Sequence, residues 1–393
     1  MALRVLHTAD WQIGRQFAGF APEAALSLSE ARIEAVGRIA DCAAQRHCDI
    51  VLVAGDVFDA QGVGERTLRR TFNAMAPFSG PWVMLPGNHD AALSESVWAR
   101  AERLGVVPEN VHLALEPKPM RWPELNLSVL PAPLTQRHTY DDLTAWFDDC
   151  KTLPGDYRIG VAHGSVKGVL ADEIDSANPI AADRADRAKL DYLALGDWHG
   201  LRVLDQRTAY SGTPEPERFR NNDPGYVIEV ELDEPGGLPR LQPIKIGRMT
   251  WSAWQDELVL SADVDALIAR LDALTAVDVV DFRPRGTLTL ADRQRLERAV
   301  QAADARAGAM RFDPEHLRLK PRREELAMFA TQGYVGEVLE TLREAVERDE
   351  GDAVAEEALL ILVDLLTEAG PQSGRLAPRN PSTGTQDATR FAP

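Results

Sequence analysis

The sequence predicts an α/β fold in which β-sheets are layered between flanking helices, and three observations lead to this prediction. Short apolar runs rich in β-branched residues alternate with longer segments of helical periodicity. Several of the short runs are apolar at every position, which is typical of strands covered on both faces. The chain has 393 residues, a length that suits two or three domains of about 150 residues each.

Strand and helix signals alternate through the first half of the chain. Apolar residues recur three and four positions apart in the first expected helix, and Ser94 is the expected N-cap of the third helix. The expected helices span residues 22–46, 65–77 and 94–104. The expected strands span residues 3–6, 49–54, 82–85, 111–115, 125–130, 157–162 and 192–195.

A domain boundary is expected near residues 233–248, because Pro and Gly in this stretch break any regular element. Beyond the boundary, two helical patterns alternate with three strand patterns, at residues 264–274, 291–305, 277–281, 286–290 and 310–312. The predicted organisation has four parts. They are a first domain (1–235), a small α/β domain (245–321), C-terminal helices (322–370) and a tail rich in Pro, Ser, Thr and Gly that is expected to be disordered (371–393).

The two expected C-terminal helices, residues 324–347 and 353–368, have unusual compositions. Apolar residues nearly encircle the second helix, so that it must be buried. The sequence leaves two possibilities open: this helix is buried within the chain, or it is buried against a partner. The helices of residues 322–370 are the candidate surface for such a partner. Residues 323–370 also contain thirteen Asp or Glu residues and only three Arg.

Composition narrows the class of protein. The chain has 61 acidic and 43 basic residues and a net charge of −18, which argues against a protein that holds nucleic acid by bulk positive charge. It leaves room for one that engages phosphates through metal ions or a partner. The three cysteines form no C-x-x-C pair, and neither a signal-peptide pattern nor an apolar stretch of about 18 residues is present. We expect a cytoplasmic protein that does not bind membranes.

Five segments place polar side chains directly after an apolar strand. Because ligand sites in open α/β sheets lie at the carboxyl ends of strands, these segments can converge although they are far apart in sequence. Their Asp, Asn and His side chains, without a thiol, suit Mn, Fe, Zn or Mg rather than a structural Cys-rich site. The segments span residues 7–12, 55–59, 87–90, 161–164 and 196–200.

These segments resemble the calcineurin-like metallophosphoesterases, whose pattern is D-x-H, GD-x-x-D, GNH-[DE], a lone H and GH-x-H. Within that superfamily, the His-Thr-Ala-Asp-Trp run at residues 7–11 is similar to the nuclease subunits of bacterial SbcCD complexes. The runs at residues 85–90 and 210–214 support the same resemblance, which covers roughly residues 3–320 in order and architecture. Any one motif alone would be weak, whereas the ordered set is specific. The fold it implies is a metallophosphoesterase β-sandwich flanked by helices, with a small α/β capping domain and C-terminal helices.

The resemblance also implies a role for each site residue. Two divalent metal ions, expected to be Mn with Mg or Fe as alternatives, would be bridged by Asp56. Asp10 and His199 would bind the first ion, and Asn88 and His163 the second. His89 would be the catalytic histidine beside the scissile phosphate, and Asp59 would orient it through a hydrogen bond.

Two positions depart from the family pattern. Gln12 stands where the D-x-H histidine is expected, and Asp197 where the first histidine of GH-x-H is expected. We expect both to be metal ligands, Gln12 through a neutral amide oxygen and Asp197 through an anionic oxygen. Such a change would shift the site towards oxygen-preferring Mn or Mg and away from Zn.

Other side chains near the motifs have simpler expected roles. Trp11 and Trp198 could stack on a nucleobase, but packing is the favoured interpretation. Arg15, Arg202, Arg218 and Arg220 could contact phosphates, although solvated or ion-paired arginine is the more common state.

The leading functional hypothesis is a two-metal DNA phosphodiesterase that acts in DNA repair. A phosphodiester is an anion that repels hydroxide. Two metals about 3.5–4 Å apart neutralise that charge, lower the pKa of a bound water and hold the attacking and leaving oxygens in line. By resemblance, the protein would form a homodimer and bind an SMC-like ATPase of the SbcC type that holds the DNA. Two alternatives stay open: a phosphoesterase for a nucleotide or phospho-sugar, and a weakly metallated, non-catalytic regulatory subunit.

Overall fold

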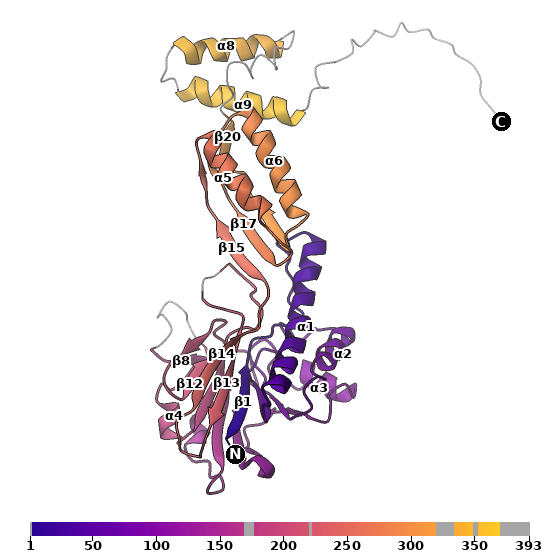
Figure 1. Cartoon of the computed structure of the whole chain (residues 1–393), viewed down its shortest axis with the longest axis vertical. Coiled ribbons are helices and arrows are strands. Elements are labelled where there is room, and N and C mark those ends of the chain that lie inside the picture. The colour runs from indigo at the N-terminus through magenta and orange to yellow at the C-terminus, as the bar shows by residue number, and fades with distance from the viewer. Residues whose placement is uncertain (1, 169–176, 220–221, 320–333, 349–352, 370–393) are drawn as a thin grey trace, which may run out of the picture. The chain divides into compact units, whose positions relative to one another are not determined.

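The computed structural model describes the chain except for residues 1, 169–176, 220–221, 320–333, 349–352 and 370–393 (Figure 1). The chain divides into two structural units and passes between them several times. The first unit contains Met1–Trp254, Leu274–Phe282 and Asp304–Phe312, and the second contains Gln255–Ala273, Arg283–Ala303 and Asp313–Pro393.

Two six-stranded sheets form the centre of the first unit. The order in the first sheet is β14-β13-β1-β2-β3-β4, and the order in the second is β11-β12-β10-β7-β6-β5. The first sheet is built from β1 (Leu3–Thr8), β2 (Ile50–Val53), β3 (Trp82–Met84), β4 (Val111–Leu113), β13 (Tyr226–Leu232) and β14 (Arg240–Lys245). The second is built from β5 (Met120–Trp122), β6 (Leu127–Ala132), β7 (Tyr157–His163), β10 (Tyr192–Gly196), β11 (Arg202–Val203) and β12 (Thr208–Tyr210).

Parallel strands occupy the middle of both sheets. β1, β2, β3 and β4 pair in parallel, as do β6, β7, β10 and β12. Strands β13, β14, β5 and β11 add antiparallel partners. The parallel strands β2, β6, β7 and β10 are buried along nearly their whole length. This burial explains why their residues are mostly apolar, with Ser128, Arg158 and His163 as the polar exceptions.

The two sheets pack face to face, and helices cover their outer faces. Val5 and Leu52 of the first sheet share one buried cluster with Ile159 and Ala194 of the second. The other face of the first sheet is covered by α1 (Pro22–Gln45), α2 (Glu65–Ala74) and α3 (Val97–Arg103). The other face of the second sheet packs on the short helices η2 (Ala145–Phe147) and α4 (Arg184–Arg187). The predicted α/β fold class with a helix-flanked sandwich is therefore confirmed (Figure 1).

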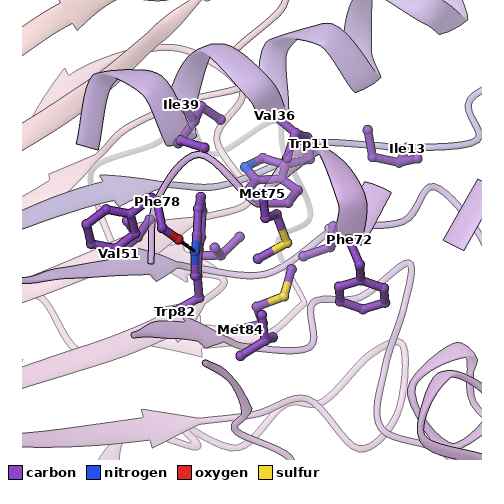
Figure 2. Packing of buried hydrophobic residues seen from close by; sticks show 14 of the residues in the cluster. Trp11, Ile13, Val36, Ile39, Val51, Phe72, Met75, Phe78, Trp82 and Met84 are labelled. Atoms are coloured by element: carbon purple, nitrogen blue, oxygen red, sulfur yellow. Dashed lines mark hydrogen bonds between the residues drawn. The ribbon is translucent and has the colours of Figure 1, made fainter. Parts of the chain in front are cut away.

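Helix α1 shows why this sequence forms the outer layer. Pro22 occupies the first turn, where its missing N–H costs nothing. Val36 and Ile39 then point to the sheet, where Trp11, Phe72 and Trp82 complete the cluster (Figure 2). The indole of Trp82 also donates a hydrogen bond of 3.5 Å to the carbonyl of Phe78. Trp11 is buried, which agrees with its expected packing role.

Two local predictions are wrong. The N-cap of α3 is Ser96, whose hydroxyl accepts a hydrogen bond from the Ala99 amide, because the chain is still in a turn at Ser94. Regular structure also persists inside residues 233–248, where β14 pairs with β13. The Gly- and Pro-rich residues 233–237 form the turn of this hairpin, and Pro243 is tolerated because β14 is an edge strand.

The remaining short elements complete the first unit. A 3₁₀ turn η1 (Pro123–Leu125) precedes β6, and β8 (Ser165–Val166) pairs in parallel with β9 (Pro179–Ile180). A parallel three-stranded sheet with the order β15-β17-β19 follows, built from β15 (Thr250–Trp254), β17 (Asp278–Phe282) and β19 (Ala309–Phe312).

The second unit contains its own parallel sheet, with the order β16-β18-β20, and four helices within the described residues. The strands are β16 (Glu257–Leu258), β18 (Arg285–Leu288) and β20 (Leu317–Leu319). The helices are α5 (Ser261–Asp272), α6 (Leu290–Asp304), α8 (Tyr334–Arg348) and α9 (Ala353–Ala369). The predicted boundaries at residues 235, 245–321 and 322–370 stay a prediction, and the predicted tail at 371–393 and helical residues 324–333 lie outside the described residues.

The sequence left open where the apolar surface of helix α9 is buried, and the structure shows that part of it is buried within this chain. Leu359 and Val363 are buried in a cluster with Leu319 of β20 and Leu339 of α8, so one side of α9 packs within the chain. Its other side exposes Val354, Ile361 and Leu365, at 79%, 51% and 57% exposure. Within the described residues, none of the helices has the length and apolar character to span a membrane.

Candidate metal centre

The sandwich brings the predicted ligand segments to one end of its parallel strands. Asp10 and Asp56 follow the neighbouring parallel strands β1 and β2, and Asn88 and His89 follow β3. In the second sheet, His163 is the last residue of β7. Asp197 and His199 follow β10, the parallel neighbour of β7. Because parallel strands end at the same edge, all five segments can contribute to one site.

The ligand loops have an unusual backbone. Four of the nine non-glycine residues with positive φ among the described residues are predicted ligands: Asp10 (55°), Gln12 (51°), Asp56 (53°) and Asp197 (101°). Such conformations cost on the order of 1–3 kcal/mol each and persist only where the surroundings impose them. Here the Asp10 and Gln12 amides donate 3.0 Å hydrogen bonds to the carbonyls of Gly55 and Asp56. The first two loops therefore hold each other in the strained conformation.

Two glycines are required by the close approach of these loops. A Cβ at Gly55, which has a φ of +90°, would lie 2.3 Å from Nδ1 of His163. A Cβ at Gly87 would lie 2.2 Å from Oδ1 of Asp56. The ligands can lie this close together because Gly55 and Gly87 have no side chain.

Asp10, Asp56 and His199 form the first group of possible metal ligands. One ligand atom from each residue lies within 4.8 Å of the other two. Nε2 of His199 is 4.0 Å from Oδ1 of Asp10, which is too long for a hydrogen bond. Two ligands that each lie about 2.1 Å from a shared ion can be separated by this distance, so the arrangement fits a metal site.

Gln12 contacts this group through Asp56 and has one polar atom without a partner. Its Nε2 donates a 2.7 Å hydrogen bond to Oδ2 of Asp56. Its Oε1 is buried and has no hydrogen-bond partner. A buried carbonyl oxygen without a partner is costly, and an oxygen ligand to a hard cation would remove that cost.

His163 and Asn88 form a second group around Asp56. Nδ1 of His163 lies 2.9 Å from the carbonyl of Ala54, so that this nitrogen is the donor. Nε2 faces the site, at 3.1 Å from Oδ1 of Asn88, 3.6 Å from Oδ1 of Asp56 and 3.7 Å from Oδ1 of Asp197. Asp56 therefore faces both groups, as expected for a bridging ligand.

The electrostatics of the cluster also favour a bound cation. Burial raises the pKa of Asp10 to about 6 and also raises that of Asp197. Burial alone would lower the pKa of His163, yet the carboxylates of Asp56, Asp10 and Asp197 outweigh it and raise this pKa to about 9. Three carboxylates packed together in a buried site repel one another, and metal ions relieve this repulsion. The residues present therefore fit divalent metal ions.

His89 lies next to the bridging carboxylate. Its amide donates a 2.9 Å hydrogen bond to Oδ1 of Asp56, and its Nε2 is 4.0 Å from Oδ2 of Asp56. Its Nδ1 lies 2.8 Å from the main-chain carbonyl of Asp59. The carboxylate of Asp59 instead faces Arg15 at 3.3 Å. Asp59 thus contacts His89 through its backbone, which fixes Nδ1 as the donor and leaves Nε2 directed towards the site.

The comparison with known families decides the class of this centre. The family model described as calcineurin-like phosphoesterase matches residues 3–228, which is more than half of the chain. The chain belongs to the calcineurin-like phosphoesterases. Members of this family are metal-dependent hydrolases of phosphoester bonds.

Three curated relatives of this phosphoesterase cover different shares of the chain. The D subunit of nuclease SbcCD from Rhodobacter capsulatus is 36% identical over 72% of this chain and 78% of its own length. The protein of the same name from Escherichia coli K12 is 25% identical over 69% of this chain and 74% of its own length. An uncharacterized metallophosphoesterase, YhaO of Bacillus subtilis, is 25% identical over 58% of this chain, and the match spans only 57% of YhaO.

Sequence reasoning missed three polar residues that support the metal centre of this phosphoesterase. Asp90 accepts hydrogen bonds from the amides of Gly87 (2.7 Å) and Phe58 (3.0 Å), and burial together with Asp56 raises its pKa to about 7. Its place directly after His89 in the Gly-Asn-His-Asp run was the available signal. Arg32 of α1 donates to the carbonyls of Asp10, Trp11 and Glu215, and Glu217 contacts His199. No sequence pattern marked these two residues.

The arginines near the motifs are engaged with protein groups where the structure describes them. Arg15 and Arg218 both pair with Glu217, and the guanidinium of Arg202 lies 5.8 Å from the ring centre of Trp198. The default interpretation as paired arginine is therefore confirmed for Arg15 and Arg218. Arg220 lies outside the described residues.

Proposed function

We propose that this protein is a two-metal DNA phosphodiesterase that acts in DNA repair as the nuclease subunit of an SbcCD-like complex. One observation carries the proposal: the Asp10–Asp56–His199 group and the His163–Asn88 group meet at Asp56 with His89 beside it. Two relatives named as the D subunit of nuclease SbcCD match about seventy per cent of the chain, which favours DNA over a small-molecule substrate.

The residues divide between two ions as follows. Asp10, Gln12, Asp56 and His199 would hold one divalent ion, and Asp56, Asn88, His163 and Asp197 the other. When bound, the two ions neutralise the charge of the phosphodiester and lower the pKa of a coordinated water. The donor set contains carboxylate and amide oxygens and only two imidazoles, a composition that favours Mn, with Mg or Fe as alternatives, over Zn.

His89 supplies the proton chemistry. Because its Nδ1 donates to the Asp59 carbonyl, a proton on Nε2 can be given to the leaving oxygen of the scissile bond. Protonating the leaving alkoxide lowers the barrier to bond cleavage, and imidazole is the side chain best suited to this near neutral pH.

DNA and protein partners follow from the distribution of charge and apolar surface. A chain with a net charge of −18 has little bulk attraction for DNA, so a partner is needed to hold it. The exposed Val354, Ile361 and Leu365 recur at intervals of seven and four residues and form one stripe along α9. We propose that an SMC-like ATPase of the SbcC type binds this stripe. A homodimer is part of the same proposal.

The test compares substrates and metal content in purified protein. We expect the wild-type chain with Mn²⁺ to cleave linear DNA and to bind two Mn²⁺ per chain, and Asp56→Ala to lose both properties. Glu229→Gln is the matched control, since Glu229 is a buried carboxylate of β13 paired with Arg46.

Each alternative predicts a different result. Hydrolysis of nucleotides or phospho-sugars with intact DNA would indicate a small-molecule phosphoesterase. A folded wild-type chain that binds less than one metal equivalent would indicate a non-catalytic regulatory subunit. Cleavage of DNA that is unaffected by Asp56→Ala would contradict the proposed site.

A further inference from the structure

The residue behind His199 is an acid that belongs to none of the expected motifs. Glu217 lies eighteen positions after His199, and its side chain is 1% exposed. Its Oε1 is 2.6 Å from Nδ1 of His199. A buried carboxylate is costly unless it is paired and hydrogen-bonded, so its position calls for a specific role.

The short contact determines which nitrogen of His199 is available to a metal. A carboxylate can only accept, so the proton must be on Nδ1 of His199. Arg218 Nη2 also lies 3.0 Å from Nδ1, but the closer carboxylate requires this nitrogen to be the donor. Nε2 then presents its lone pair towards Oδ1 of Asp10, 4.0 Å away.

Two arginines compensate the charge of Glu217. Arg218 donates to Oε1 through Nε at 2.8 Å, and Nη1 of Arg15 lies 3.2 Å from Oε2. The contact with Arg15 is ionic, since Oε2 has no hydrogen-bond partner. The same Nη1 of Arg15 is 3.3 Å from Oδ1 of Asp59, whose carbonyl accepts from His89. Arg15 thus links the support of His199 to the segment that orients His89.

We propose that Glu217 is a positioning residue that fixes the Nδ1–H tautomer and the ring orientation of His199, with Arg15 and Arg218 holding its carboxylate in place. The inference rests on the proposed metal centre and adds a supporting residue to it. A carboxylate behind a histidine ligand raises the basicity of the ring and restricts its rotation. Replacing such a partner weakens metal binding about 10- to 100-fold in other metal sites.

The experiment measures Mn²⁺ binding by calorimetry and the His199 tautomer by ¹⁵N NMR of the imidazole nitrogens in metal-free protein. Two variants differ in what they retain. Glu217→Gln keeps an oxygen that accepts the Nδ1 proton but removes the charge, whereas Glu217→Leu removes both. Glu229→Gln again serves as the control. Glu217→Gln keeps the test valid if Glu217→Leu does not fold because it buries Leu beside two arginines.

We expect Glu217→Leu to weaken one of the two Mn²⁺ equivalents about 10- to 100-fold and to leave the other unchanged. The Nδ1–H tautomer signal of His199 should be lost at the same time. Glu217→Gln should fall between Glu217→Leu and wild type, and Glu229→Gln should match wild type in both measurements. A folded Glu217→Gln or Glu217→Leu chain with wild-type affinity for both equivalents and an unchanged tautomer would overturn the proposal.

The two proposals fail in different ways. A wild-type chain that binds two Mn²⁺ but cleaves no DNA contradicts the proposed function, while the role of Glu217 is still decided by its own variants. A wild-type chain that cleaves DNA while its Glu217 variants bind metal normally contradicts only the role of Glu217. A wild-type chain that binds no metal contradicts both.

Discussion

At the scale of single residues, the metal centre depends on which atom each side chain presents. Gln12 gives its amide nitrogen to Asp56 and keeps a buried oxygen without a partner. Asp59 gives His89 its main-chain carbonyl, and its carboxylate faces Arg15. Residue type alone therefore does not establish a role, because each of these residues has two polar groups to offer.

His89 and Asp59 should respond differently to substitution. We expect His89→Gln to lower the rate of DNA cleavage about 100- to 10,000-fold, because general acid catalysis contributes on this order. Mn²⁺ stoichiometry should stay at two, since His89 is not one of the proposed ligands. Single-turnover kinetics with metal analysis measures both quantities.

Asp59→Asn tests whether the main-chain carbonyl or the carboxylate of Asp59 matters to His89. It keeps the carbonyl that orients His89 and removes only the pair with Arg15. A partly exposed ion pair of this kind contributes about 0–1 kcal/mol, so cleavage should stay near the wild-type rate. A loss as large as that of His89→Gln would show that the carboxylate itself acts on His89.

At the scale of the elements, the strand-end loops are shaped by glycines that let them touch. Gly87→Ala would place a Cβ 2.2 Å from Oδ1 and 2.5 Å from the amide nitrogen of Asp56. We expect the free energy of unfolding to fall by about 1–3 kcal/mol, as in other overpacked sites, and Mn²⁺ binding to weaken because Asp56 is displaced.

Gly62→Ala is the control for this prediction, since a Cβ at Gly62 meets nothing within 4 Å. Urea denaturation and Mn²⁺ titration of both variants give the comparison. Equal behaviour of the two alanine variants would mean that Gly87 does not set the position of Asp56.

Helix α9 offers a second test at this scale. Ile361 and Leu365 are exposed, so replacing both with Ser should change stability little. We expect this double variant to lose co-purification with a co-expressed SbcC-type ATPase, because the apolar stripe is the proposed contact. Leu238→Ser, at a site 55% exposed in the hairpin loop after β13, is the matched control. Undiminished co-purification of the double variant would remove α9 from the interface.

At the scale of the first structural unit, buried polar contacts join the two sheets. His7 of β1 lies 2.9 Å from the hydroxyl of Tyr192 and 3.2 Å from the carbonyl of Leu195, both on β10 of the other sheet. Its ring is buried, and burial lowers its pKa from 6.5 to about 3. His7 is therefore a neutral tie between the sheets at physiological pH.

This shift predicts how stability depends on pH. Unfolded His7 takes up a proton near pH 6.5, whereas folded His7 does so only near pH 3. The contribution of neutral His7 to the free energy of unfolding is fully present above pH 6.5. It is lost as the pH falls from 6.5 to 3, by about 1.4 kcal/mol per pH unit. His7→Gln retains a hydrogen-bond donor and an acceptor but does not titrate. We expect it to remove the part of the slope of unfolding free energy against pH that His7 causes. Urea unfolding of metal-free protein at pH 7, 6 and 5 measures it.

His138 is exposed, so His138→Gln should keep the wild-type slope. If His7→Gln also keeps that slope, the pKa of His7 must be the same in the folded and unfolded chains, and burial does not lower it.

The parts of the fold that the sequence predicted are those with a strong local signal. Buried parallel strands such as β2 and β10 contain no charged residue, and helices such as α1 have regular apolar spacing. Strand β14 had a weak signal, because it is an exposed edge strand that contains a proline. Strand β13 was also not predicted, although its sequence is rich in Val, Ile and Leu. The N-cap of α3 was misplaced by two residues, since its position depends on a turn that follows no periodic pattern.

The sequence by itself determined the chemistry available to the centre. Asp10, Asp56, Asn88, His163 and His199 each follow or end a buried strand, and parallel strands must deliver such residues to one edge. The tertiary structure decided which atoms meet. The contact of Glu217 with His199 and the shared contact of Arg15 with Glu217 and Asp59 arise from separate loops. No local pattern encodes such contacts, because hydrogen-bond partners are set by proximity in the folded chain rather than by spacing along it.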